Sequence, residues 1–223
     1  MLVSPAGAPG GSPFSNGMFA ARHPPLSGSV NRFRKHTDTG PDWAAGCNVG
    51  SESIRRDLIE AALINRVTWM IPNALALVGS RAGGEWNGMT TSWITQLSME
   101  PVVIGIGVDN KAVTHRLISE GGSFSVNLWS PDDRRVFVKF SKPATKEGMT
   151  LNGRVIREGV TGVPIFEDAI AWMECEVRRA IDFGTHTLFA GELVDAGVTD
   201  QPGRAAWMGD TRMKYGGVKR GGH

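Results

Sequence analysis

The chain has 223 residues, 41% of them hydrophobic and 21% charged, with a formal net charge of +2. This length allows one large domain or two small ones to bury a core unaided. The charge is too small to indicate nucleic-acid binding, and no apolar run approaches the roughly 20 residues that span a bilayer. The two cysteines, Cys47 and Cys175, form neither a disulfide framework nor a metal cluster, which favours a reducing, cytoplasmic location.

Residues 1–50 differ in composition from the rest of the chain. They hold 14 of the 41 Gly and Pro residues, and their four basic and two acidic side chains account for the whole net charge of +2. Such a segment buries too little apolar surface to offset the entropy of ordering it. We expect an N-terminal extension that is flexible or packs as an arm on the domain or on a partner subunit, followed by one domain over residues 51–223.

A helix is expected first, near residues 51–64, where apolar residues keep a helical period and Ser51 or Ser53 can cap the start. Two further helices are predicted at 111–120 and 132–140. Short runs rich in Val, Ile, Thr and Trp predict six strands, at 74–78, 92–97, 102–108, 124–129, 169–177 and 187–194. Many strands with few crossover helices favour a mainly β fold, a closed antiparallel barrel, over a doubly wound sheet.

Several motif-based functions are excluded. The five histidines are scattered, with no Cys, Asp or Glu at metal-ligand spacing, so no metal site is expected. The glycines form no P-loop, the run from Gly79 to Gly84 lacks the spacing of a dinucleotide fingerprint, and no G-x-S-x-G nucleophile elbow occurs. Standard hydrolases and nucleoside triphosphatases are therefore disfavoured.

The densest polar stretch lies between Trp86 and Ser98, with five hydroxyl side chains in nine residues. On one alternating strand these side chains would face both sides of the sheet. Hydroxyls suit a ligand with many donors and acceptors, such as a ribityl chain, a phosphate or a ring amide. The alternative is an exposed edge strand, on which Thr is common because it favours the extended conformation.

A second polar feature is Asp109-Asn110-Lys111, between a predicted strand and the predicted helix at 111–120. Asn110 is suited to cap that helix, whose first-turn N–H groups and Lys111 ammonium would form an anion site. Any capped helix has such an N-terminus, so this feature is not specific by itself. The third feature is His186 at the mouth of a predicted strand, where a lone histidine is more often structural than catalytic.

In this order, these stretches resemble the flavin reductase-like family of FMN-binding split-barrel proteins, over roughly residues 66–220. Each motif alone is common, but four of them in register and in order are specific. The segment at 213–220 is similar to the family's closing segment. The four motifs are N-G-M-T-T-S-W-I-T-Q-L-S from Asn87, N-K-A-V-T-H from Asn110, F-S-V-N-L from Phe124, and G-T-H-T-L-F-A-G-E-L-V from Gly184.

The resemblance implies a six-stranded antiparallel Greek-key split barrel with a few flanking helices, which forms a homodimer and holds FMN, or FAD, near the subunit interface. It places His186 beside the nicotinamide or the flavin ring, as the catalytic residue. Phe124 and Asn127 fit structural support better. The residues that the resemblance assigns to the flavin, from ring edge to phosphate, are Asn87, Gly88, Met89, Thr90, Thr91, Ser92, Trp93, Ser98, Asn110, Lys111 and Thr114.

The family's chemistry implies an NAD(P)H:flavin oxidoreductase, which transfers hydride from NAD(P)H to FMN or FAD and supplies reduced flavin or electrons to a partner such as a monooxygenase. Hydride transfer between stacked rings requires no nucleophile or acid–base pair, which agrees with the motifs that are missing. Alternatives on the same fold are an FMN-containing electron-transfer flavoprotein of the flavoredoxin type, an oxidase or a reductase of another acceptor, and a non-catalytic flavin- or haem-binding module.

Overall fold

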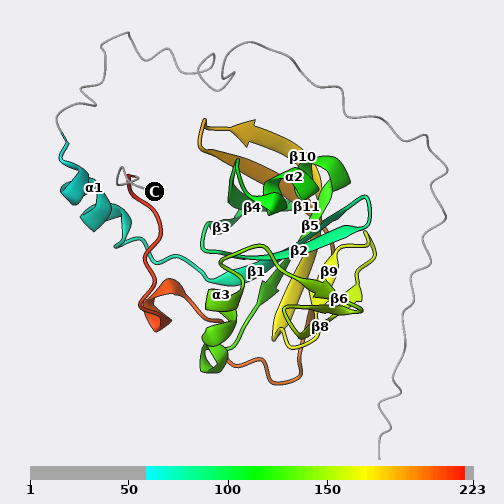
Figure 1. Ribbon diagram of the computed structural model, residues 1–223. Coiled ribbons are helices and arrows are strands. Elements are labelled where there is room, and N and C mark those ends of the chain that lie inside the picture. Colours follow the sequence, from blue (N-terminus) through cyan, green and yellow to red (C-terminus); the bar gives the residue numbers. More distant parts are fainter. Residues whose placement is uncertain (1–58, 219–223) are drawn as a thin grey trace, which may run out of the picture. The chain divides into compact units, whose positions relative to one another are not determined.

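The computed structural model describes residues 59–218, so the expected arm and the expected cap at Ser51 or Ser53 lie outside the described residues. One antiparallel sheet is formed by β1 (Ala76–Ala82), β2 (Glu85–Thr91), β3 (Ile94–Met99), β4 (Val102–Asp109), β5 (Ser123–Leu128), β10 (Ala171–Asp182) and β11 (His186–Val198). Their order across the sheet is β2-β1-β5-β10-β11-β4-β3 (Figure 1). Every neighbouring pair is antiparallel.

The predicted mainly β, antiparallel fold is confirmed, but the sheet has seven strands where six were expected. The polar stretch at 86–98, interpreted as one strand, belongs to two. Thr91 at the end of β2 pairs with Ala76 on β1, whereas Ile94 at the start of β3 pairs with Ile106 on β4. The chain therefore passes from one edge of the sheet to the other between residues 91 and 94.

This crossing forces the sheet to curl. Seven flat strands would hold the edge strands β2 and β3 about 29 Å apart. Only Ser92 and Trp93 lie between the two strands, and the chain from Thr91 to Ile94 spans at most about 11 Å. The two sheet edges therefore approach each other at this end, where Ser92 and Trp93 bridge them.

Helices cover parts of the sheet. α2 (Val113–Gly121) packs on β1 and β2, and it ends at Gly122, whose φ of 73° is the left-handed conformation that favours glycine. The expected helix at 132–140 is a 3-10 turn (Pro131–Asp133) followed by α3 (Arg135–Lys139). The first described helix, α1 (Ala61–Thr68), overlaps the end of the one expected near residues 51–64.

A second, smaller sheet was not expected from the sequence. Its four strands, in sheet order, are β6 (Lys146–Glu147), β7 (Thr150–Leu151), β8 (Arg154–Glu158) and β9 (Pro164–Phe166). Strands of two to five residues are too short to show an alternating pattern, which explains why they were missed.

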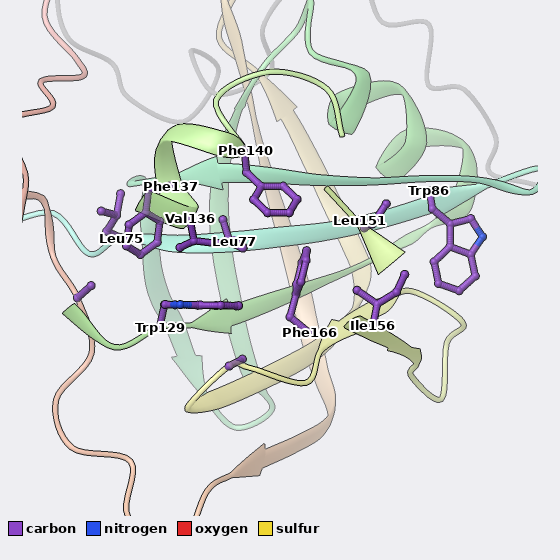
Figure 2. Close-up of a cluster of buried hydrophobic side chains, with 12 residues drawn as sticks. Leu75, Leu77, Trp86, Trp129, Val136, Phe137, Phe140, Leu151, Ile156 and Phe166 are labelled. Atoms are coloured by element: carbon purple, nitrogen blue, oxygen red, sulfur yellow. The ribbon is translucent and has the colours of Figure 1, made fainter. Parts of the chain in front are cut away.

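Two clusters of buried apolar side chains hold these elements together. Figure 2 shows the first, in which Trp129, Phe140 and Phe166 gather near its centre. The rings of Phe140 and Phe166 meet edge to face with their centroids 5.2 Å apart. Burying one such ring contributes about 1.5–3 kcal/mol. Val136 and Phe137 on α3, and Phe140 directly after it, belong to this cluster, so the cluster fixes α3 against the rest of the core.

Candidate functional site

A cavity of about 420 Å³ lies where the crossing segment meets the end of β4, the start of α2 and the C-terminal part of the described chain. This volume is in the range of small-molecule sites. Five residues that the resemblance assigned to the flavin line it: Met89, Thr90, Thr91, Ser92 and Lys111. The other lining residues are Leu75, Gly107, Asp109, Ala112, Ser141, Met208, Met213 and Tyr215.

The first wall of the pocket is formed by residues 89–92, at the end of β2 and in the crossing segment. Thr90 and Ser92 differ in their hydrogen bonding. Thr90 Oγ1 donates to Phe137 O at 2.7 Å and Thr90 N–H donates to Phe140 O at 2.9 Å, so both of its donors are used. Ser92 is only 4% exposed, and its Oγ has no hydrogen-bond partner among the described residues. A buried hydroxyl without a partner costs about 1–3 kcal/mol. The Ser92 hydroxyl therefore lacks a hydrogen-bond partner, and a ligand in the pocket could supply one.

The start of α2 forms the second wall. Its N-cap residue, Ala112, has no capping side chain. His115 N–H donates to Ala112 O at 3.1 Å, whereas the two N–H groups before it, at residues 113 and 114, have no carbonyl partner within the helix. Lys111 places a positive charge beside them, while Asp109 Oδ1 accepts the Lys111 N–H at 2.9 Å. Helix N–H groups and an ammonium together suit an anionic group such as a phosphate.

The expected capping role of Asn110 is wrong. Asn110 Nδ2 donates to Asp182 Oδ1 at 2.9 Å and to Gly184 O at 3.2 Å, and Asn110 Oδ1 accepts from Thr187 Oγ1 at 2.8 Å. The turn before α2 is closed instead by the carboxylate of Asp109, and the helix begins three residues after Asn110. The amide of Asn110 therefore binds the hairpin between β10 and β11.

Four more of the expected cofactor residues, Asn87, Thr114, Gly88 and Ser98, lie outside the pocket wall. Asn87 Nδ2 donates to Thr114 Oγ1 at 2.8 Å, and because both residues are buried this bond ties β2 to α2. A Cβ on Gly88 would lie 2.8 Å from Phe166 Cζ, so this glycine allows close packing of the core. Ser98 lies on β3, a mostly exposed edge strand, which matches the alternative interpretation of the polar stretch.

An aromatic corner borders the pocket and consists of Trp93, His186 and Tyr215. His186 Nε2 lies 2.7 Å from the Tyr215 hydroxyl, and the ring centroids of Trp93 and His186 are 4.6 Å apart. Burial, and secondarily the charge of Asp109, raise the pKa of Tyr215, so its phenol keeps its proton at neutral pH. Tyr215 was not identified from the sequence, although it is the only tyrosine and lies in the family-like closing segment.

The segment that carries Met208, Met213 and Tyr215 forms the third wall and is held at its end by α1. Val218 N–H donates to Asn65 Oδ1 at 3.0 Å, and Trp69 Nε1 donates to Gly216 O at 3.2 Å. These contacts place the red segment beside the cyan helix α1 in Figure 1. The third wall therefore depends on contacts more than 140 residues apart in sequence.

Other chemistries have little support in the part of the chain that the structure describes. No group of three or more His, Cys, Asp or Glu side chains there could hold a metal ion. Burial, and then the charge of Glu174, raise the pKa of the free Cys175 thiol to about 12, which disfavours its thiolate. None of the described helices has the length and apolar character needed to cross a membrane.

Comparison with known proteins identifies the family. A family model described as flavin reductase like domain matches residues 69–217. The ferric-chelate reductase (NAD(P)H) of Archaeoglobus fulgidus is 33% identical over 132 residues, which cover 58% of this chain and 78% of that protein. The reductase component of an FADH(2)-dependent resorcinol hydroxylase from Rhizobium sp. is 31% identical over 133 residues, with 58% and 73% covered.

A solved structure agrees with this match. The crystal structure of an FMN-binding protein from Thermus thermophilus with bound p-hydroxybenzaldehyde matches this chain with 28% sequence identity and a TM-score of 0.51. The match covers 58% of this chain and 73% of that protein. The family match spans both edge strands, the crossing segment, α2, the β10–β11 hairpin and Tyr215. The chain therefore belongs to the flavin reductase-like domain family.

Proposed function

We propose that the protein is an NAD(P)H:flavin oxidoreductase that transfers hydride from NAD(P)H to FMN or FAD. The observation that carries this proposal is the unpartnered Ser92 hydroxyl in the wall of a pocket that the aromatic corner borders. The printed activities of relatives support it, since one is an NAD(P)H-dependent reductase and another is a reductase component of a flavin-dependent hydroxylase.

The residues of the pocket fit a flavin. Ser92 Oγ can bind a polar atom of the ring or the ribityl chain, and the first turn of α2 with Lys111 can bind the phosphate. Thr90 N–H cannot serve as a donor to the ring, because it is bonded to Phe140 O. A bound flavin supplies hydride acceptance at its N5, and the protein needs only to hold the two rings within about 3–3.5 Å.

The aromatic corner is the proposed position of the nicotinamide. Trp93 and Tyr215 offer apolar ring faces that can exclude water, and His186 is oriented by its bond to Tyr215. His186→Ala should slow flavin reduction while flavin binding is kept. An equal loss of both properties, or of neither, would contradict the placement of His186.

We further propose the split-barrel form of the fold and a homodimer. The crossing at Ser92 and Trp93 brings both sheet edges together, as a barrel requires. α1 buries its polar Asn65 and exposes Leu63 and Val67, and the apolar residues Ile59 before the helix and Met70 after it are exposed as well. An apolar stripe on a helix is stabilised when it is covered, and a second copy of this chain is the proposed cover. Leu63→Lys should lower the mass measured by light scattering from that of a dimer to that of a monomer.

The proposed acceptor of the reduced flavin is a partner monooxygenase, as for the relative that is a hydroxylase component. Anaerobic titration of the purified protein with FMN and then with NADH or NADPH tests the whole proposal. Bleaching of the flavin by either nucleotide is the expected result. Flavin binding without bleaching would instead indicate an electron-transfer flavoprotein, and failure to bind flavin would refute both functions.

A further inference from the structure

A chain of hydrogen bonds outside the pocket joins α2 to the hairpin between β10 and β11. His115 Nε2 lies 2.9 Å from Thr187 Oγ1, which is 2.8 Å from Asn110 Oδ1. Asn110 Nδ2 in turn donates to Asp182 Oδ1 at 2.9 Å. Asp182 Oδ1 also accepts the Gly184 N–H at 2.7 Å, so this carboxylate closes the hairpin on itself.

The direction of every proton in this chain follows from its partners. Asp182 can only accept, and so can Gly184 O, so the Asn110 amide must present its NH₂ group to both and its oxygen to Thr187. Thr187 uses its single proton on Asn110 Oδ1, so it must accept from His115. His115 therefore carries a proton on Nε2. If the Asn110 amide were rotated by 180°, its oxygen would face two other acceptors, Asp182 Oδ1 and Gly184 O.

The hairpin held by this chain presents His186. Asn110 N–H donates to Thr185 O at 3.0 Å, and Phe183 N–H donates to His186 O at 2.9 Å. Gly184 has a φ of 91°, which allows the tight turn between these bonds. Asp182 and Asn110 thus fix the backbone on both sides of the turn, immediately before the residue whose ring meets Trp93 and Tyr215.

We propose that Asp182 and Asn110 are positioning residues for hydride transfer, which hold His186 in place at the nicotinamide end of the site. This inference rests on the proposed function. Neither Asp182 nor Asn110 lines the pocket, so their contribution acts through the hairpin and not through contact with the flavin. Displacement of a group by about 1 Å can reduce a reaction rate by up to about a hundredfold.

The test compares three variants of the full chain. Asp182→Ala removes the acceptor, Asp182→Asn keeps an oxygen that can accept from both Asn110 and Gly184, and Asp195→Ala removes an aspartate elsewhere on β11 that accepts only from the neighbouring Ala196 N–H among the described residues. Flavin affinity is measured by fluorescence titration, and the rate of reduction by anaerobic single-turnover absorbance.

Asp182→Ala should reduce flavin about tenfold more slowly, with flavin affinity within twofold of the unmodified protein. Asp182→Asn should stay within threefold in rate, and Asp195→Ala should be unchanged. An unchanged rate in Asp182→Ala, or a rate loss matched by the loss of flavin affinity, would overturn the positioning role.

Histidine NMR separates this inference from the proposed function. In the unmodified protein, long-range ¹H–¹⁵N spectra should show His115 protonated on Nε2. Asp182→Ala should shift the ring resonances of His186, assigned with His186→Ala, whereas Asp195→Ala should not. If the protein reduced no flavin, the proposed function would fail while the shift of His186 still supported the hairpin's role; unshifted resonances would refute the role whatever the activity.

Discussion

Replacing Ser92 with alanine should have effects of opposite sign in the flavin-free and flavin-bound proteins. Without flavin, the buried Ser92 hydroxyl has no partner among the described residues. Its removal relieves about 1 kcal/mol of desolvation cost. For a domain of this size that corresponds to a rise in melting temperature of roughly 2–4 °C.

With flavin bound, the same substitution removes a hydrogen bond worth about 1 kcal/mol. Because the flavin-free protein gains about 1 kcal/mol and the flavin-bound protein loses about 1 kcal/mol, flavin binding should weaken by about 2 kcal/mol, roughly 30-fold. Thermal melting of the flavin-free protein and fluorescence titration with FMN measure the two effects. Ser80→Ala is the matched control, because Ser80 Oγ is also buried without a partner among the described residues but does not line the pocket. It should raise the melting temperature and leave flavin affinity unchanged.

Two results would refute this reasoning about Ser92. If Ser92→Ala lowered the melting temperature of the flavin-free protein, the hydroxyl would have a stabilising partner already. If it left the dissociation constant of FMN unchanged, Ser92 would not contact the flavin. Because Ser80→Ala removes a buried hydroxyl away from the pocket, a loss of flavin affinity common to both variants would be an indirect packing effect and would not indicate contact with the flavin.

Three further predictions concern stability and reactivity. Gly88→Ala should destabilise the protein by about 1–3 kcal/mol in urea unfolding, since the new Cβ would lie 2.8 Å from Phe166 Cζ. Burial lowers the pKa of His115, although the charges of Asp182 and Asp109 oppose the shift. The folded state therefore prefers neutral His115. Stability should be complete above the ordinary histidine pKa of 6.5 and should fall as the pH drops through the lower pKa of the folded state, more in the unmodified protein than in His115→Gln. With a pKa of about 12, Cys175 should react with a disulfide reagent at pH 8 only after unfolding; rapid reaction of the native protein would contradict its burial.

Local patterns predicted those parts of the fold that depend on neighbouring residues. The alternation in 187–194 placed β11 correctly, with Thr187, Phe189 and Gly191 as its buried residues. The end of α2 followed from the adjacent glycines, because Gly122 adopts the left-handed conformation there. In both cases the determining interaction lies within a few residues of the chain.

Other features depend on distant contacts and were missed. Ser92 and Trp93 both suit a strand, so no local signal indicates that the chain pairs with β1 before these two residues and with β4 after them. Asn110 fits a helix cap by composition, but the carboxylate of Asp182, 72 residues away, binds its amide. Tyr215 contacts His186, 29 residues away in sequence, and the segment after Tyr215 is bound by Asn65 on α1, 153 residues from Val218.

The crossing at Ser92 and Trp93 also limits how the site can diversify. An ordinary loop tolerates insertions because its ends stay in place when its length changes. Here Ser92 lines the pocket, and Ser92 and Trp93 together connect opposite edges of one sheet. Added length would let those edges separate, so new ligand preferences are accessible at this wall only through substitution. The wall at Met208, Met213 and Tyr215 is not part of the sheet, and there the site can change through length as well.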